Sequence, residues 1–63
     1  MDKYTIFYSN DCMMWGVEFP SEDGQFRQQA LPPKGKGGRR GQSAYTYYKG
    51  VAERWARELN NNK

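Results

Sequence analysis

The sequence contains no histidine and a single cysteine, Cys12. One cysteine cannot form an internal disulfide, and without histidine a zinc site of Cys and His ligands cannot be assembled. The lack of histidine also removes the side chain that most often acts as a general base near neutral pH. We therefore expect no metal, no cofactor and no catalytic residues. The thiol of Cys12 could be reactive in an exposed turn. Because no base or acid partner is visible, we favour the other interpretation, that Cys12 is simply a small residue that the turn tolerates.

The chain also lacks a long apolar run, and its longest apolar stretch is far too short to span a bilayer. Its acidic start, Met1 and Asp2, does not have the basic region of a secretory signal. These absences predict a soluble, cytoplasmic protein with no membrane partner. The 63 residues allow one domain, residues 1–63. A domain of that size buries only about 60% of the surface that its unfolded chain exposes.

Aromatic side chains are abundant, with ten among the 63 residues. Large rings bury much apolar area per residue, so they are an efficient means of building a small core. Self-association is the other support open to a chain without disulfides or metal. We therefore expect an aromatic core, and a homodimer that uses the free edge of the predicted hairpin.

Residues 3–19 predict a β-hairpin. Residues 4–8 and 13–19 each alternate with period two, and Ser9-Asn10-Asp11 between them is a turn sequence. Pro20 ends the second strand and residues 21–24 turn the chain again. Residues 25–31 suit a third strand only at an exposed edge or face, because three glutamines and an arginine make a poor strand interior.

Residues 44–60 predict an amphipathic helix. Its apolar stripe has helical spacing and consists of Tyr48, Val51, Ala52, Trp55 and Leu59. Ser43 or Thr46 suits the N-cap, and Gly50 either permits close contact with the sheet or marks a weak first turn. The fold class is therefore a small two-layer α+β domain. We expect an antiparallel β-hairpin or three-stranded sheet, with the C-terminal helix on one face and the other face in water.

Charge is distributed unevenly along the chain. Residues 1–23 carry five acids and one lysine, whereas residues 24–52 carry six cations and no acid. Four of these cations fall in residues 32–42, which we call the basic segment and expect to form a flexible glycine-rich loop. The P-loop sequence is absent, since Gln42 stands where its lysine must reach the phosphates, so nucleotide hydrolysis is excluded. A general anion site at the helix start remains, because Arg39 and Arg40 lie beside it in the sequence.

The basic segment favours nucleic acid as the partner. Lysine and arginine neutralise phosphates, glycine lets the loop follow a backbone, and exposed tyrosines can stack on unpaired bases of DNA or RNA. Residues 37–41 are similar to the arginine–glycine segments of RNA-binding proteins. Tyr45 and Tyr47 are expected to be exposed beside the cations, because they fall outside the apolar stripe. The candidate nucleic-acid or anion contacts are Arg27, Lys34, Lys36, Arg39, Arg40, Tyr45, Tyr47 and Lys49.

Two other interpretations of the same residues remain open. The basic segment could simply be a solvated loop that keeps a small protein soluble. Alternatively, the protein could be a protein-binding modulator, such as a phage-type inhibitor of a host enzyme, whose loop and tyrosines bind an acidic protein surface. The element order is comparable in layout to small DNA-binding domains with a three-stranded sheet backed by a helix, such as the arm-site domains of phage integrases. No motif is shared with them, so no family follows from the layout.

Overall fold

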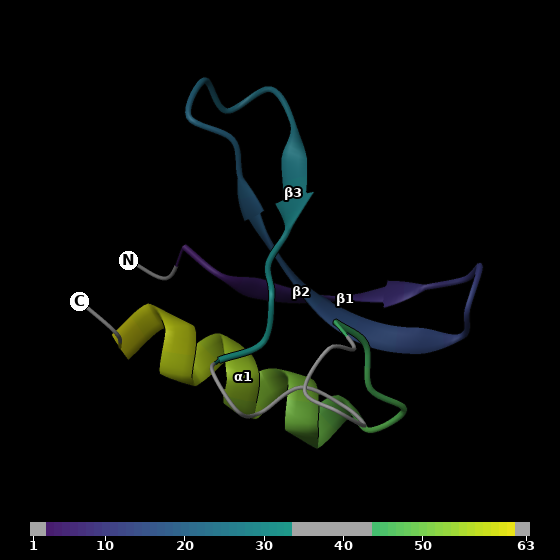
Figure 1. Ribbon diagram of the computed structural model, residues 1–63. Coiled ribbons are helices and arrows are strands. Elements are labelled where there is room, and N and C mark those ends of the chain that lie inside the picture. The colour runs from purple at the N-terminus through teal and green to yellow at the C-terminus, as the bar shows by residue number, and fades with distance from the viewer. Residues whose placement is uncertain (1–2, 34–43, 62–63) are drawn as a thin grey trace.

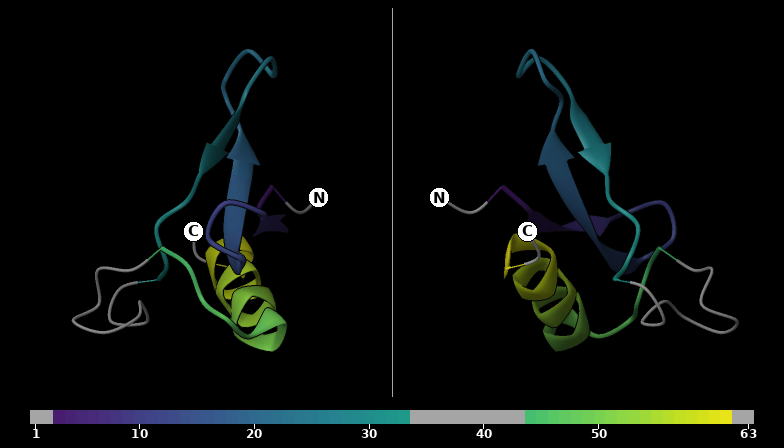
Figure 2. Two further views of the ribbon diagram at one scale, coloured as in Figure 1. Left: turned by 90° about the vertical axis from the view of Figure 1, so that its right-hand side faces the viewer. Right: turned by 60° about the vertical axis from the view of Figure 1, so that its left-hand side comes forward.

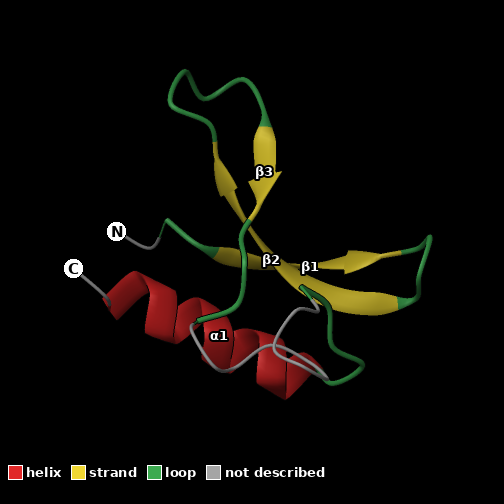
Figure 3. Ribbon diagram, in the orientation of Figure 1, coloured by secondary structure: helices red, strands yellow, loops and turns green. Residues whose placement is uncertain are grey.

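The computed structural model describes residues 3–33 and 44–61, and these form a two-layer α+β domain (Figure 1). Strands β1 (Thr5–Ser9), β2 (Met14–Pro20) and β3 (Arg27–Gln29) are followed by helix α1 (Lys49–Asn61). The sheet is antiparallel with the order β1-β2-β3, and α1 lies beneath the β1–β2 pair (Figure 3). The predicted fold class is therefore confirmed, in its three-stranded form. In the described part of the chain, no helix has the length and apolarity needed to cross a membrane.

The first hairpin forms as predicted, with a shift at its turn. Thr5 pairs with Glu18 and Ser9 with Met14, which leaves four residues, 10–13, in the loop. Met13 was predicted to begin the second strand, but it has a φ of 57° and its side chain is 67% exposed. A left-handed residue cannot continue an extended strand, so the strand begins one residue later.

The second turn matches its sequence signal. Ser21 N–H donates to the carbonyl of Phe26 at 2.8 Å, and Gly24 has the positive φ, 76°, that a glycine adopts without strain. The Asp23 carboxylate accepts hydrogen bonds from the Ser21 hydroxyl at 2.6 Å and from the Gln25 N–H at 3.0 Å. Strand β3 covers only three residues, so the prediction of 25–31 was too long. All three are exposed, as expected of an edge.

Apolar side chains between the sheet and α1 form the core. Its buried members are Val17, Ala30, Ala52, Trp55 and Ala56. Partly buried side chains pack around them, including Ile6 and Phe19 from the sheet and Leu59 from α1. The predicted apolar stripe is correct except for Tyr48, which is 71% exposed.

The helix begins later than predicted, at Lys49 rather than residue 44. The carbonyl of Tyr48 accepts hydrogen bonds from Val51 N–H at 3.1 Å and Ala52 N–H at 3.2 Å, so Tyr48 occupies the N-cap position. Thr46, one predicted N-cap, instead accepts a hydrogen bond from Tyr48 N–H on its hydroxyl oxygen at 3.2 Å. The other candidate, Ser43, lies outside the described residues.

Residues 44–46 belong to the edge of the sheet rather than to the helix. Trp15 N–H donates to the Thr46 carbonyl at 2.7 Å, and Thr46 N–H donates back to Trp15 at 2.9 Å. On the same edge of β2, Ala30 N–H donates to the carbonyl of Val17 at 2.8 Å. Strand β3 and Thr46 therefore share the edge of β2. The chain leaves this edge after Ala30 and returns to it at Thr46.

Candidate nucleic-acid interface

The sheet has one face that α1 does not cover, which we call the open face. Because Val17 is buried against α1 and side chains alternate along a strand, Gly16 and Glu18 point to the opposite side. Their cross-strand partners share that side, and both views of Figure 2 show α1 covering only the other one. The residues of the open face that form the candidate site are therefore Thr5, Phe7, Gly16, Glu18 and Gln29, together with Arg27, which alternation places on the same side as Gln29.

An aromatic pair lies at one end of the open face. The ring centroids of Phe7 and Tyr45 are 6.3 Å apart with an edge-to-face angle of 74°. A Cβ atom added to Gly16 would lie only 2.9 Å from the Phe7 ring, so that ring covers the glycine directly. Tyr45 was predicted to be exposed, but it is half-buried because it packs on Phe7. It is thereby fixed where the chain returns from the basic segment.

Phe7 belongs to the site but was not among the predicted site residues. Alternation along the first strand places Phe7 on the other face of the sheet from Ile6. It does not indicate that a second ring, that of Tyr45, packs on this face. The available signal was Gly16, because a glycine inside a strand often marks a bulge or the close approach of another group. The register pairs Phe7 with Gly16 directly. Aromatic cover over a cross-strand glycine is a known way of stabilising such a position.

Arg27 lies across the three strands at the other end of the open face. Its Nε donates to Glu18 Oε1 at 3.2 Å, and its Nη2 donates to Thr5 Oγ1 at 2.7 Å. The Arg27 side chain is still 46% exposed, but Glu18 partly compensates its charge. Arg27 pairs with Pro20, whereas Tyr45 precedes Thr46, which pairs with Trp15. Arg27 and the aromatic pair are therefore five residues apart along β2, or about 17 Å.

The remaining described candidates surround the start of α1. Lys49 lies on the α1 side of the sheet, where its Nζ is 5.5 Å from the centroid of the Trp15 ring. This cation–π contact holds the ammonium group, which has no acidic partner within residues 3–33 and 44–61. Tyr47 is 71% exposed, as predicted. The first turn of α1 contains no acid, so its unpaired N–H groups and dipole leave this end of the helix electropositive.

The four cations of the basic segment, Lys34, Lys36, Arg39 and Arg40, lie outside the described residues. The structure describes the two points between which they must lie, Pro33 and Ala44. Gln29 Nε2 donates to the carbonyl of Ala44 at 3.4 Å, which ties the returning chain to β3. Ala44 is thus held at the sheet edge that adjoins the open face and the start of α1.

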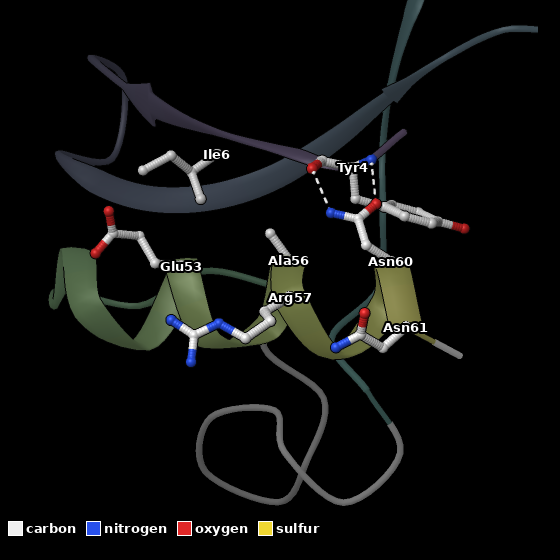
Figure 4. A pocket seen from close by; sticks show the side chains of 7 residues that line it. All are labelled: Tyr4, Ile6, Glu53, Ala56, Arg57, Asn60 and Asn61. Atoms are coloured by element: carbon white, nitrogen blue, oxygen red, sulfur yellow. Dashed lines mark hydrogen bonds between the residues drawn. The ribbon is translucent and has the colours of Figure 1, made fainter. Parts of the chain in front are cut away.

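A second surface feature lies on the opposite edge, between β1 and α1. It is a groove of about 430 Å³ lined by Tyr4, Ile6, Glu53, Ala56, Arg57, Asn60 and Asn61 (Figure 4). The Asn60 side chain closes one end, because it accepts a hydrogen bond from Tyr4 N–H at 2.8 Å and donates one to the Tyr4 carbonyl at 3.0 Å. Across residues 3–33 and 44–61, no group of three or more His, Cys, Asp or Glu side chains is placed to hold a metal ion.

The chain matches no family model, no curated protein and no solved structure. The function therefore rests on the chemistry of its own surfaces. The described residues offer two surfaces: the open face and the groove beside β1.

Proposed function

We propose that the protein is a small, non-catalytic nucleic-acid-binding protein. Its basic segment binds the phosphate backbone of DNA or RNA, and the open face holds unpaired bases. One observation carries the proposal: Ala44, two residues after the basic segment in the sequence, is hydrogen-bonded to Gln29, and the next residue, Tyr45, packs on the ring of Phe7. A cytoplasmic location is part of the same proposal.

Electrostatic attraction supplies most of the affinity in this proposal. Cations that neutralise phosphates release counterions, which favours binding at low salt. Lys34, Lys36, Arg39 and Arg40 make the principal contacts, and Lys49 extends them toward the start of α1. Arg27 contributes least, because its Nε and Nη2 already donate to Glu18 and Thr5 and the Glu18 carboxylate partly compensates its charge.

The aromatic side chains favour single strands over duplexes. A base stacked on an aromatic ring contributes about 1–3 kcal/mol, and any base can stack because every base has a π face. Phe7 and Tyr45 are partly buried and held by packing, so little ordering is required of them when a base binds. Tyr47, which is exposed and lies two residues after Tyr45, supplies a further ring. We expect tighter binding to unpaired than to paired DNA of the same sequence.

The test is the salt dependence of binding to a labelled mixed-sequence oligonucleotide, followed by fluorescence anisotropy. If three to five cations neutralise phosphates of duplex DNA, log K falls with log salt at a slope of about −3 to −4.5. A variant with the four cations of the basic segment replaced by alanine should lose most of this slope. The control removes the same number of positive charges elsewhere, through Lys3→Ala, Arg54→Ala, Arg57→Ala and Lys63→Ala.

The two variants have equal net charge, so a nonspecific charge effect changes both alike. Binding that is insensitive to salt, or equal affinity of the two variants, would contradict the proposal. Circular dichroism spectra establish that both variants remain folded. Phe7→Leu, which retains an apolar side chain, should weaken binding to single strands more than binding to duplexes.

A protein-binding modulator is the second candidate, favoured by two exposed tyrosines. Tyr47 and Tyr48 are each 71% exposed, and they follow the basic segment in the sequence after residues 43–46. Tyrosine and arginine are common hot-spot residues, so these rings and the cations could bind an acidic protein surface. A pull-down after nuclease treatment separates the candidates. A stoichiometric protein that survives the nuclease supports the modulator, whereas loss of all partners supports nucleic acid.

A further inference from the structure

We propose that the free edge of β1 is a homodimer interface. Two copies of the chain pair their β1 strands antiparallel about a two-fold axis at Phe7, which joins the two sheets into one of six strands. This inference does not depend on nucleic-acid binding, because it rests on the backbone groups of β1 and on the groove beside that strand.

The hydrogen bonds of β2 indicate which backbone groups of β1 point to the outer edge of the sheet. Along β2, the N–H or carbonyl groups of Trp15 and Val17 point toward Thr46 and Ala30, so those of Gly16 and Glu18 point toward β1. Their partners on β1 are Phe7 and Thr5. The backbone groups of Ile6 and Tyr8 therefore point away from β2, to the outer edge.

Tyr4 supports this assignment and marks where the open edge ends. Tyr4 lies two residues before Ile6, so its N–H and carbonyl point to the same side as those of Ile6 and Tyr8. They bond to the Asn60 side chain rather than to β2. Asn60 thus takes the place of a neighbouring strand at Tyr4 (Figure 4). The edge that remains available is Thr5–Ser9, which is the whole of β1.

Nothing in β1 protects this edge from pairing. Natural proteins shield edge strands with charged side chains, proline or a bulge, but Thr5–Ser9 contains no charge and no proline and pairs with β2 without a break in register. Tyr8, a large side chain beside the edge, is 43% exposed. A small domain without an internal disulfide also gains core area by dimerising.

Antiparallel pairing about Phe7 satisfies the free groups. Ile6 of one copy exchanges two hydrogen bonds with Tyr8 of the second copy, and Tyr8 exchanges two with Ile6, so four new backbone bonds form. Phe7 faces Phe7 across the axis, and Thr5 faces Ser9. Both pairs are of the type without direct hydrogen bonds, in which side chains approach most closely. The two open faces then form one continuous surface.

Charge complementarity on the α1 side identifies the occupant as a second copy. The same pairing brings the two grooves together across the axis, and each groove carries Glu53 and Arg57, which have opposite charge (Figure 4). In a two-fold interface each patch meets its own copy, so a patch with one charge of each sign can complement itself. Tyr8 of the second copy, opposite Ile6, enters the groove from the β1 side.

Sedimentation equilibrium of the full chain over a concentration series up to the millimolar range tests the proposal. The apparent mass should rise from 7.4 kDa toward twice that value. Hydrogen exchange of the Ile6 and Tyr8 amides should slow as concentration increases. A mass of 7.4 kDa throughout the series, or exchange of both amides that does not change with concentration, overturns the proposal.

A matched pair of double variants tests the register. Thr5→Glu with Ser9→Glu places like charges opposite each other twice in the dimer, whereas Thr5→Glu with Ser9→Lys places opposite charges there. Both variants carry the same glutamate at position 5, so any change in the contact of that position with Arg27 is common to the two. The first variant should dimerise at least about tenfold more weakly than the second. Equal dimerisation of the two variants overturns the register. Loss of dimerisation in both, with both folded, overturns it also, because Glu opposite Lys should be tolerated if Thr5 faces Ser9.

Discussion

Replacement of Asn60 by alanine should destabilise the fold by removing the link between the end of α1 and β1. The Asn60 side chain accepts one hydrogen bond from the Tyr4 backbone and donates another to it. A typical hydrogen bond contributes about 0.5–1.5 kcal/mol, so two contribute about 1–3 kcal/mol. Both are only partly buried beside an open groove, where water can replace them. We therefore expect about 1–2 kcal/mol, the lower part of that range.

Asn61→Ala is the control, because Asn61 is the next residue of α1, lines the same groove and is exposed. Both substitutions exchange asparagine for a better helix former, by roughly half a kcal/mol. Their difference therefore isolates the contact with Tyr4. The assay is urea unfolding followed by the fluorescence of Trp15 and Trp55 and by circular dichroism, with the free energy of unfolding compared at equal slope.

In a domain of 60–100 residues, 1 kcal/mol lowers the melting temperature by about 4–8 °C. Asn60→Ala should therefore melt about 4–16 °C below Asn61→Ala, given the expected loss of about 1–2 kcal/mol. Free energies of unfolding that agree within about 0.3 kcal/mol would refute the reasoning, because independent measurements on distant sites scatter by that much.

Three further predictions concern single positions in the turns, the sheet and the helix. The hydrogen bond from the Ser21 hydroxyl, and after it that from the Gln25 N–H, lower the pKa of Asp23. The ionised carboxylate therefore stabilises the fold at neutral pH, and this stabilisation is lost as the pH falls through the lowered pKa. An NMR titration should give a midpoint below that of a free Asp, and Ser21→Ala should raise that midpoint. Gly16→Val should destabilise the fold and expose the Phe7 ring, because an added Cβ lies 2.9 Å from that ring; unchanged stability and ring shifts would count against the packing. Gly50→Ala should stabilise the fold by about 0.5–1 kcal/mol in thermal unfolding, because alanine is the better helix former and nothing lies within 4 Å of the added Cβ. A loss of stability would contradict the exposed place of Gly50 in the first turn of α1.

The elements could be predicted from the sequence because their patterns are local. The alternation of Trp15, Val17 and Phe19 and the helical stripe that contains Trp55 each identify an apolar face without reference to the rest of the chain. The turn at Gly24 follows from the same kind of information. These are the features that the structure confirms.

The errors arise where distant residues decide the local structure. Residues 44–46 resemble a helix start, but Thr46 pairs with Trp15, 31 positions earlier, and that pairing delays the helix to Lys49. Tyr45 lies outside the helical stripe and was therefore predicted to be exposed, yet it packs on Phe7. No local pattern shows which strand face a returning loop will cover.

The candidate site was predictable in part. The cations of residues 34–40 and the neighbouring tyrosines are visible in the sequence, because charge and composition need no fold to be recognised. Phe7 was not predictable as a site residue, since its role depends on the Gly16 register and on the return of the chain at Tyr45. Arg27 was predicted as a phosphate contact, but its pairing with Glu18 was not visible from the sequence.

The most direct measurement is the change of backbone amide shifts in the full chain when a mixed-sequence single-stranded oligonucleotide is added. The nucleic-acid proposal predicts shifts at residues 34–49 together with Phe7 and Gly16 on the open face. Residues that line the groove, such as Arg57 and Asn61, should change little. Shifts confined to the groove, or no shifts at all at low salt, would contradict the proposal.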